Sequence, residues 1–100
     1  MHNHTLAPSG DGTVMLDIGG DIGALLLYTT AAQHGSEIDI ERVDSGQRSH
    51  VAVRERKLTT GTAYAAVYPA LAAGDYLLHL PAGARPVTIT GGAINEVHDD

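Results

Sequence analysis

Alternation of apolar and polar positions is the clearest pattern in this chain of 100 residues. Residues 37–43, with the sequence EIDIERV, place both isoleucines on one face and three carboxylates on the other. This period of two is typical of a half-buried β-strand. Residues 50–56, HVAVRER, repeat the pattern with Val51 and Val53 directed inward. Because turn-forming residues occupy 44–47, the two runs together predict a β-hairpin.

Further short apolar runs, separated by turn-forming residues, occur along the rest of the chain. They predict strands over residues 13–18, 24–29, 62–68, 76–80, 86–90 and 93–97, with a tight hairpin at Gly91-Gly92. The expected fold class is all-β, an antiparallel β-sandwich of about seven to eight short strands, prealbumin-like or immunoglobulin-like. Residues 1–12 are polar and are expected to form a flexible N-terminal segment, so residues 13–100 form the single domain.

Two of these segments also fit a helix. Residues 24–34 could be a helix with Asp21 as N-cap and a glycine after its end. Residues 64–71 carry apolar side chains at helical spacing, but Pro69 removes a backbone donor and disfavours a continuous helix. The strand interpretation is preferred for both, and a short helical turn around residues 30–34 is compatible with it.

The apolar composition is unusual because the chain contains neither Phe nor Trp. The core must therefore consist of Ala, Val, Leu and Ile together with some of the four tyrosines. A buried tyrosine hydroxyl needs a hydrogen-bond partner. We therefore expect the phenols of Tyr28, Tyr64, Tyr68 and Tyr76 near the surface or at the mouth of a cavity.

The net charge of −6 disfavours nucleic acid as a partner, since such binding requires clustered Lys and Arg. One local basic run, residues 54–57 (RERK), is interpreted as an edge strand whose charges prevent edge-to-edge pairing, with an acidic partner as the alternative. The chain has no cysteine, which excludes disulfides, Cys-ligated metals and thiol nucleophiles.

Two features bear on the location of the protein. The longest apolar run, residues 24–28, is far shorter than the ~20 residues of a membrane-spanning helix. The N-terminal sequence MHNHTLAPSGDG lacks the basic and apolar regions that are typical of a signal peptide. We therefore expect a cytoplasmic protein without a membrane span.

The segment AAVYPALAAGDYLLHL, residues 65–80, contains the pattern Leu-x-x-Gly-x-Tyr at Leu71, Gly74 and Tyr76. It resembles a structural signature of transthyretin-like and carboxypeptidase-regulatory-like β-sandwich domains. With LDIGGDIGALLLYT and VTITGGAINEV, the chain is also similar to a group of small actinobacterial-type proteins, some labelled phospholipases. The resemblance implies a sandwich fold. The phospholipase label is not carried over, because neither a His-Asp pair beside a calcium loop nor a Gly-x-Ser-x-Gly motif is found.

The glycine-containing stretch LDIGGDIG has three interpretations. A tight turn requires only glycines that accept positive φ and an aspartate that bonds its own backbone. A Ca²⁺ site would use Asp17 and Asp21, but calcium takes at least about six oxygen ligands. An anion site is disfavoured because both carboxylates would repel the anion. The turn is preferred, and a cation at Asp17 and Asp21 is the alternative.

Histidine and aspartate near the two ends of the chain could bind a divalent metal. His2 and His4 precede the domain, and His98 and Asp99 lie near the last residue. Such nitrogen and oxygen ligands suit Zn²⁺, Cu²⁺ or Ni²⁺, provided that the two ends meet. Solvated tails with incidental metal affinity are the alternative. No cofactor other than such a divalent metal is expected.

Three further histidines lie within the predicted strands and turns: His34, His50 and His79. His79 alternates with two leucines and is expected to point outward. If His50 and His79 shared a sheet face with a tyrosine, they could form a proton-transfer or ligand pocket. The alternative is that both are ordinary surface histidines.

No group of residues has the spacing of a known catalytic motif, so we expect a non-catalytic binding or interaction module, although an enzyme is not excluded. The partner is expected to be another protein or a second copy of the chain. The Ala-rich segment 63–73, with its tyrosines, is the predicted contact surface of a homo-oligomer. The alternative is a metal-binding protein, or a small metal-dependent hydrolase, that uses His and Asp.

Overall fold

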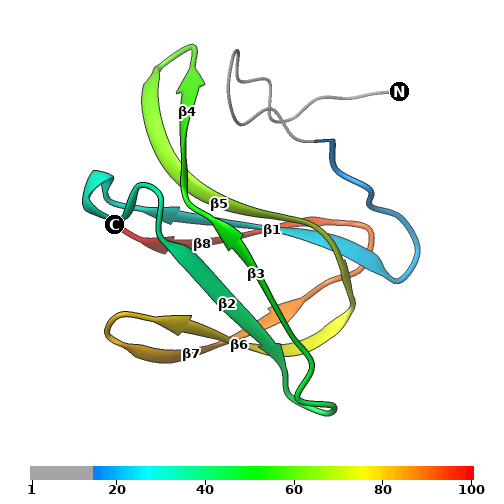
Figure 1. The fold of residues 1–100 in the computed structure, drawn as a ribbon. Coiled ribbons are helices and arrows are strands. Elements are labelled where there is room, and N and C mark those ends of the chain that lie inside the picture. The colour runs from blue at the N-terminus through cyan, green and yellow to red at the C-terminus, as the bar shows by residue number, and fades with distance from the viewer. Residues whose placement is uncertain (1–14) are drawn as a thin grey trace.

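The computed structural model describes residues 15–100, and Figure 1 shows their arrangement. The expected N-terminal segment 1–12 and the first two residues of the expected strand 13–18 lie outside the described residues. The elements are β1 (Ile22–Thr29), a short 3₁₀ helix η1 (Ala31–Gln33), β2 (Glu37–Arg42), β3 (Arg48–Ala52), β4 (Arg54–Leu58), β5 (Gly61–Ala72), β6 (Gly74–Leu80), β7 (Gly83–Ile89) and β8 (Ile94–Asp99).

These strands form two four-stranded sheets that face each other (Figure 1). Sheet 1 has the order β4-β5-β1-β8, and sheet 2 has the order β3-β2-β6-β7. Neighbouring strands in these sheets are antiparallel, with the exception of β1 and β8, which are parallel. The expected all-β sandwich is confirmed, with one parallel pair that was not predicted. Within residues 15–100, no helix has the length and apolar character needed to cross a membrane.

The core lies between the two sheets and is built from alternating residues of their inner faces. Leu25 and Leu27 of β1 pack with Ile40 of β2 and Leu78 of β6, all almost fully buried. Tyr68 of β5 is also in this core, and its hydroxyl donates a 2.6 Å hydrogen bond to the carbonyl oxygen of Ile38. The expectation that the Tyr68 phenol lies at the surface is therefore wrong, because a backbone carbonyl satisfies its hydroxyl inside the core.

The strand expected over residues 50–56 is divided at Val53. The β2–β3 hairpin is present in sheet 2 as predicted, but the chain then crosses to sheet 1 and continues as β4. Val53 is fully buried at the crossing, its N–H donates to Ser36 O at 2.8 Å, and its carbonyl accepts from Gly35 N at 2.9 Å. Val53 therefore connects β3 of sheet 2 to β4 of sheet 1 at this corner.

The hairpin expected at Gly91-Gly92 is wrong, because β7 belongs to sheet 2 and β8 to sheet 1. β8 pairs in parallel with β1 instead. The glycine at position 91 serves a close approach of backbones, since a Cβ atom there would lie 2.4 Å from Gly20 O. The dipeptide therefore links the two sheets.

Residues 15–18 are not a strand, so the described part of the expected strand 13–18 is wrong. The chain instead reaches β1 through a tight turn, in which Gly19 and Ile22 exchange two backbone hydrogen bonds of 2.9 Å. Gly20 has a φ of +55° at the first central position, which glycine adopts readily. The turn interpretation of the glycine-containing stretch is therefore confirmed.

Both segments that also fitted a helix are strands, β1 and β5, and the short helical turn expected after the first is present as η1. In the pairing of β1 with β5, Gly23 lies opposite Leu71 and Leu25 lies opposite Tyr68, so the register is irregular between these two positions. Pro69 lies at this irregularity, where its missing N–H costs the sheet no ladder hydrogen bond. Its carbonyl oxygen accepts the N–H of Asp17 at 3.1 Å.

Candidate functional site

A cleft of about 480 Å³ opens between the two sheets beside the β2–β3 turn, and we call it the β2–β5 cleft. One wall is apolar and is made by Ile40 of β2 and by residues 70–72 at the end of β5. The other wall is polar and includes Ser45, Gln47 and Ser49. Its volume and its mixture of apolar surface with a few polar groups are typical of small-molecule pockets.

Arg42 forms the floor of the cleft and is held by hydrogen bonds on all three guanidinium nitrogens. Its Nε donates to Asp44 Oδ1 at 3.0 Å, and its Nη1 donates to Tyr76 OH at 2.8 Å and Ala72 O at 3.1 Å. Its Nη2 donates to Ala73 O at 3.0 Å. The hydrogen bonds with Tyr76 and Asp44 raise the pKa of Arg42 above its ordinary value. Arg42 therefore ties the end of β2 to the corner between β5 and β6.

The residues of the Leu-x-x-Gly-x-Tyr pattern gather at this floor. Leu71 lines the apolar wall, and the Tyr76 hydroxyl donates to Ala72 O at 2.6 Å while it accepts from Arg42. Gly74 has a φ of +146°, and a Cβ atom there would lie 2.6 Å from Arg42 Nη2. The glycine of the pattern thus makes room for the guanidinium.

Arg48 borders the cleft, but its side chain lies on the outer face of sheet 2, because it pairs with the outward Glu41 in the register of β2. Its contacts are much looser than those of Arg42. Its Nε lies 3.8 Å from Asp39 Oδ2, and its Nη2 lies 3.9 Å from Glu41 Oε1. The side chain is 49% exposed. Such long, exposed contacts contribute little to stability, so the guanidinium of Arg48 keeps most of its hydrogen-bonding capacity.

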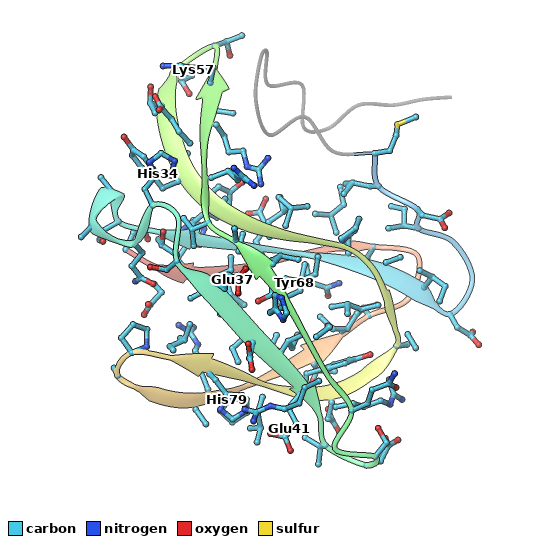
Figure 2. All side chains as sticks on the ribbon, viewed as in Figure 1. His34, Glu37, Glu41, Lys57, Tyr68 and His79 are labelled. Carbon is cyan, nitrogen blue, oxygen red and sulfur yellow. The ribbon has the colours of Figure 1, made fainter. Side chains whose placement is uncertain are left out.

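Ionisable side chains cover the outer face of sheet 2 next to Arg48, and we call them the sheet-2 ladder. They are Glu37, Asp39 and Glu41 of β2, Arg48 and His50 of β3, and His79 of β6. His79 Nε2 lies 2.9 Å from Glu41 Oε1, and Figure 2 shows these side chains next to each other. His50 Nε2 lies 3.7 Å from Glu37 Oε1. The Arg48 side chain therefore belongs to the ladder, on the face of sheet 2 opposite to Ile40 and Ser49.

The predicted placement of His79 is confirmed, since its side chain points outward and is half-buried. His50 and His79 do share a sheet face, because both lie opposite Asp39 in the register of β2. The proton-transfer pocket also required a tyrosine on this face. The nearest one in the chain, Tyr76, faces the core and is 6% exposed. The third interior candidate, His34, lies elsewhere, 5.7 Å from the ring of Tyr64.

The structure separates the metal ligands predicted near the C-terminus. His98 stacks on Tyr28 at 4.8 Å, on one face of β8. Asp99 lies on the other face, where its Oδ2 accepts a 3.4 Å hydrogen bond from Gln33 Nε2. Burial raises the pKa of Tyr28, and the charge of Glu96 raises it further.

The remaining predicted ligands lie in two places. Asp17 precedes the tight turn before β1, and Asp21 is the second central residue of that turn, where its backbone O accepts the N–H of Ala73 at 2.7 Å. His2 and His4 lie outside the described residues. Across residues 15–100, no three His, Cys, Asp or Glu side chains form a group that could hold a metal ion. Metal binding at the predicted ligands stays a prediction.

The basic run lies on β4, an edge strand of sheet 1, as predicted. Lys57 Nζ lies 2.7 Å from Glu55 Oε2, and this contact lowers the pKa of Glu55 and raises that of Lys57. The burial of Arg56 was not predicted. Its Nη2 donates to Ala65 O at 3.3 Å, and burial lowers the pKa of its guanidinium.

The segment 63–73, predicted as a self-association surface, forms most of β5. Its central residues, Ala65 to Tyr68, are each buried in the fold. This part of the segment therefore offers no free contact surface, and self-association stays a prediction.

The β2–β5 cleft itself was missed by sequence reasoning. Its floor depends on Arg42 reaching the carbonyl oxygen of Ala72 and the hydroxyl of Tyr76, which lie 30 and 34 positions further along the chain. Local periodicity does not predict contacts between residues so far apart. The available signal was an arginine that ends the alternating strand 37–43. Comparisons with protein-family models, with curated proteins and with solved structures found no match.

Proposed function

We propose that this protein is a binding module of the β-sandwich class and that the β2–β5 cleft is its ligand site. The observation that supports the proposal is the cleft of about 480 Å³, in which the apolar wall made by Ile40 and residues 70–72 faces the polar residues of the β2–β3 turn and Ser49. Pockets of this size that combine apolar surface with a few polar groups commonly bind small molecules.

The construction of the cleft also supports a binding role. Its floor is held in place, because Arg42 joins β2 to the β5–β6 corner through Nη1 and Nη2 and bonds Asp44 of the β2–β3 turn through Nε. Its polar wall is carried by the turn between β2 and β3, on the surface of the fold. Binding residues are often carried in this way, on turns that a rigid scaffold positions.

The test is a titration of ¹⁵N-labelled protein with three six-carbon probes: hexanoate, 1-hexanol and hexylammonium. We expect at least one probe to shift the amide signals of Ser49 and Leu71, which line opposite walls. Ala70→Leu fills the cleft from an exposed position and should weaken that binding by about tenfold. Ala82→Leu, in the exposed β6–β7 turn, is the matched control and should leave binding unchanged. If none of the probes shifts the cleft signals, the proposed function is wrong.

The other functions expected from the sequence have less support from the geometry. A metal-binding protein or metal-dependent hydrolase would use His98 and Asp99, which point to opposite faces of β8. Self-association through residues 63–73 would use side chains that are buried at the centre of that segment. The cleft is therefore the site on which we base the proposal.

A further inference from the structure

The charged groups of the β2–β5 cleft compensate one another. Among the described residues that line it, the charged ones are Arg42, Asp44 and Arg48. Arg42 Nε donates to Asp44 Oδ1 at 3.0 Å, so the positive and the negative charge of this pair lie in contact. Arg48 has its side chain on the outer face of sheet 2, beside Asp39 and Glu41. The inner side of the cleft therefore carries no net charge.

This balance of charge works against a charged ligand. An anion in the cleft would approach Asp44 as well as Arg42, and a cation would approach Arg42 as well as Asp44. Either ion would lose hydrating water without gaining a counter-charge of its own. Arg42 also has little to offer an anion, because its three guanidinium nitrogens already donate at 2.8–3.1 Å. An uncharged ligand therefore has a smaller desolvation cost in this cleft than an ion of the same size.

Uncharged polar side chains provide hydrogen-bonding groups on the other wall of the cleft. They are Ser45, Gln47 and Ser49. Ser45 Oγ accepts the backbone N–H of Gln47 at 3.2 Å, which leaves its own O–H to donate. Ser49 is the register partner of Ile40, so its side chain lies on the inner face of sheet 2. Hydroxyl and amide groups both donate and accept, and so they match a hydroxyl or an amide of a ligand.

The apolar wall makes a second demand on the ligand. Ile40 belongs to the hydrophobic core, and Leu71 packs against that core. Ala70 and Ala72 continue the wall with small side chains, so a short aliphatic group can pack against it. The ligand should therefore carry an apolar body next to an uncharged polar end.

We propose that the β2–β5 cleft binds small uncharged organic molecules, with a hydroxyl or amide end at Ser49 and a short apolar body against Leu71. This inference rests on the proposed function, because it names the ligand class of the same site. The pair of Arg42 and Asp44 determines the specificity. Because its two charges cancel, it selects against carboxylates and amines of the same shape as the ligand.

The experiment adds hexanamide to the same three probes and compares their affinities, measured from the amide shifts of Ser49 and Leu71 at about pH 7, where both ionic probes are charged. We expect the better of the two uncharged probes, 1-hexanol and hexanamide, to bind at least about threefold more tightly than either ion. Which of the two it is distinguishes a hydroxyl ligand from an amide ligand. If hexanoate or hexylammonium binds in the cleft as tightly as the better uncharged probe, the inference is wrong while the proposed function stands.

A variant that breaks the balance of charge sharpens this test. Asp44→Asn, in the exposed β2–β3 turn, keeps an oxygen that can accept from Arg42 Nε but removes the negative charge, so Arg42 becomes an uncompensated cation. The affinity of hexanoate relative to 1-hexanol should rise by about fivefold. Asp99→Asn is the matched control and should leave this ratio unchanged, because Asp99 pairs with the last residue of β1 and the cleft lies beside the first. An unchanged ratio in a folded Asp44→Asn variant would overturn the inference.

Discussion

The outer faces of the two sheets differ sharply at the centre of the fold. On sheet 1, Ala24 and Leu26 of β1 and Ala65 and Val67 of β5 alternate with core residues, and so point away from sheet 2. Each is nevertheless no more than 4% exposed. On sheet 2, the corresponding positions of β2 carry the carboxylates of the ladder. Sheet 1 is therefore buried on both faces along β1 and β5, whereas sheet 2 is buried on one face.

This difference decides which parts of the chain could be understood from the sequence. A strand with one exposed face alternates apolar and polar residues, as β2 does, and its inward residues Ile38 and Ile40 were predicted correctly. A strand buried on both faces is a continuous apolar run, as in ALLLY of β1. Such a run fits a strand or a buried helix equally well, and this is why β1 and β5 had a helical alternative.

The largest expected effect tests the difference between these faces directly. Leu26→Ala, on the outer face of sheet 1, should lower the free energy of unfolding by about 3 kcal/mol, because it leaves a cavity at a buried site. Leu77→Ala, on the outer face of sheet 2, is the matched control and should cost below about 1 kcal/mol. Urea unfolding measures both. Equal costs would show that the two outer faces do not differ in burial.

The next effect concerns Tyr68, the side chain that joins β5 to β2 through Ile38 O. Tyr68→Phe should cost about 1–2 kcal/mol, since the carbonyl loses its buried partner. Burial raises the pKa of Tyr68 above its ordinary value of 10.0, with a further contribution from the charge of Asp39. The hydroxyl therefore stabilises the fold fully below about pH 10, and this stability is lost as pH rises toward the raised value.

Unfolding midpoints measured from about pH 9 to about pH 11 check this prediction. The unmodified protein should lose stability over this range, and Tyr68→Phe should lose less. A variant with the same alkaline loss as the unmodified protein would show that Tyr68 is not the group responsible.

The smallest effect concerns the sheet-2 ladder. Glu41→Gln should change stability by no more than about 0.5 kcal/mol, because its contacts with His79 and Arg48 are partly exposed. Glu37→Gln, on the same face of the same strand, is the control, and urea unfolding measures both. A loss well above about 1 kcal/mol in Glu41→Gln alone would show that these contacts stabilise the fold more than exposed ion pairs do.

Local patterns predicted most strands but not which sheet each strand joins. Residues 50–56 alternate without interruption, yet the chain passes from sheet 2 to sheet 1 at Val53, whose side chain is buried in the core between the two sheets. The alternation is the same whether the partner strand lies in sheet 1 or sheet 2. For the same reason the hairpin expected at Gly91-Gly92 was wrong, and the parallel partner of β1 was not predicted.

The candidate site was harder to predict than the fold, because it depends on contacts between distant segments. Arg42 reaches the carbonyl oxygens of Ala72 and Ala73 only after β5 and β6 are in place. The sequence did contain Gly74 and Tyr76 as a recognisable pattern, but their relation to Arg42 follows from packing. Metal and proton-transfer sites were predicted at histidines and aspartates, whereas the cleft is lined mainly by common polar and apolar residues.

The parallel pairing of β1 with β8 also has a consequence for the order of events during synthesis. Ala24 pairs with Ile94 and Thr29 with Asp99, so one side of β1 has no neighbouring strand until residues 94–99 have been synthesised. At about 5–20 residues per second, that side stays open for several seconds after β1 emerges. Nascent chains stalled before β8 should therefore be the form of this protein most prone to aggregate, through the open edge of an apolar strand.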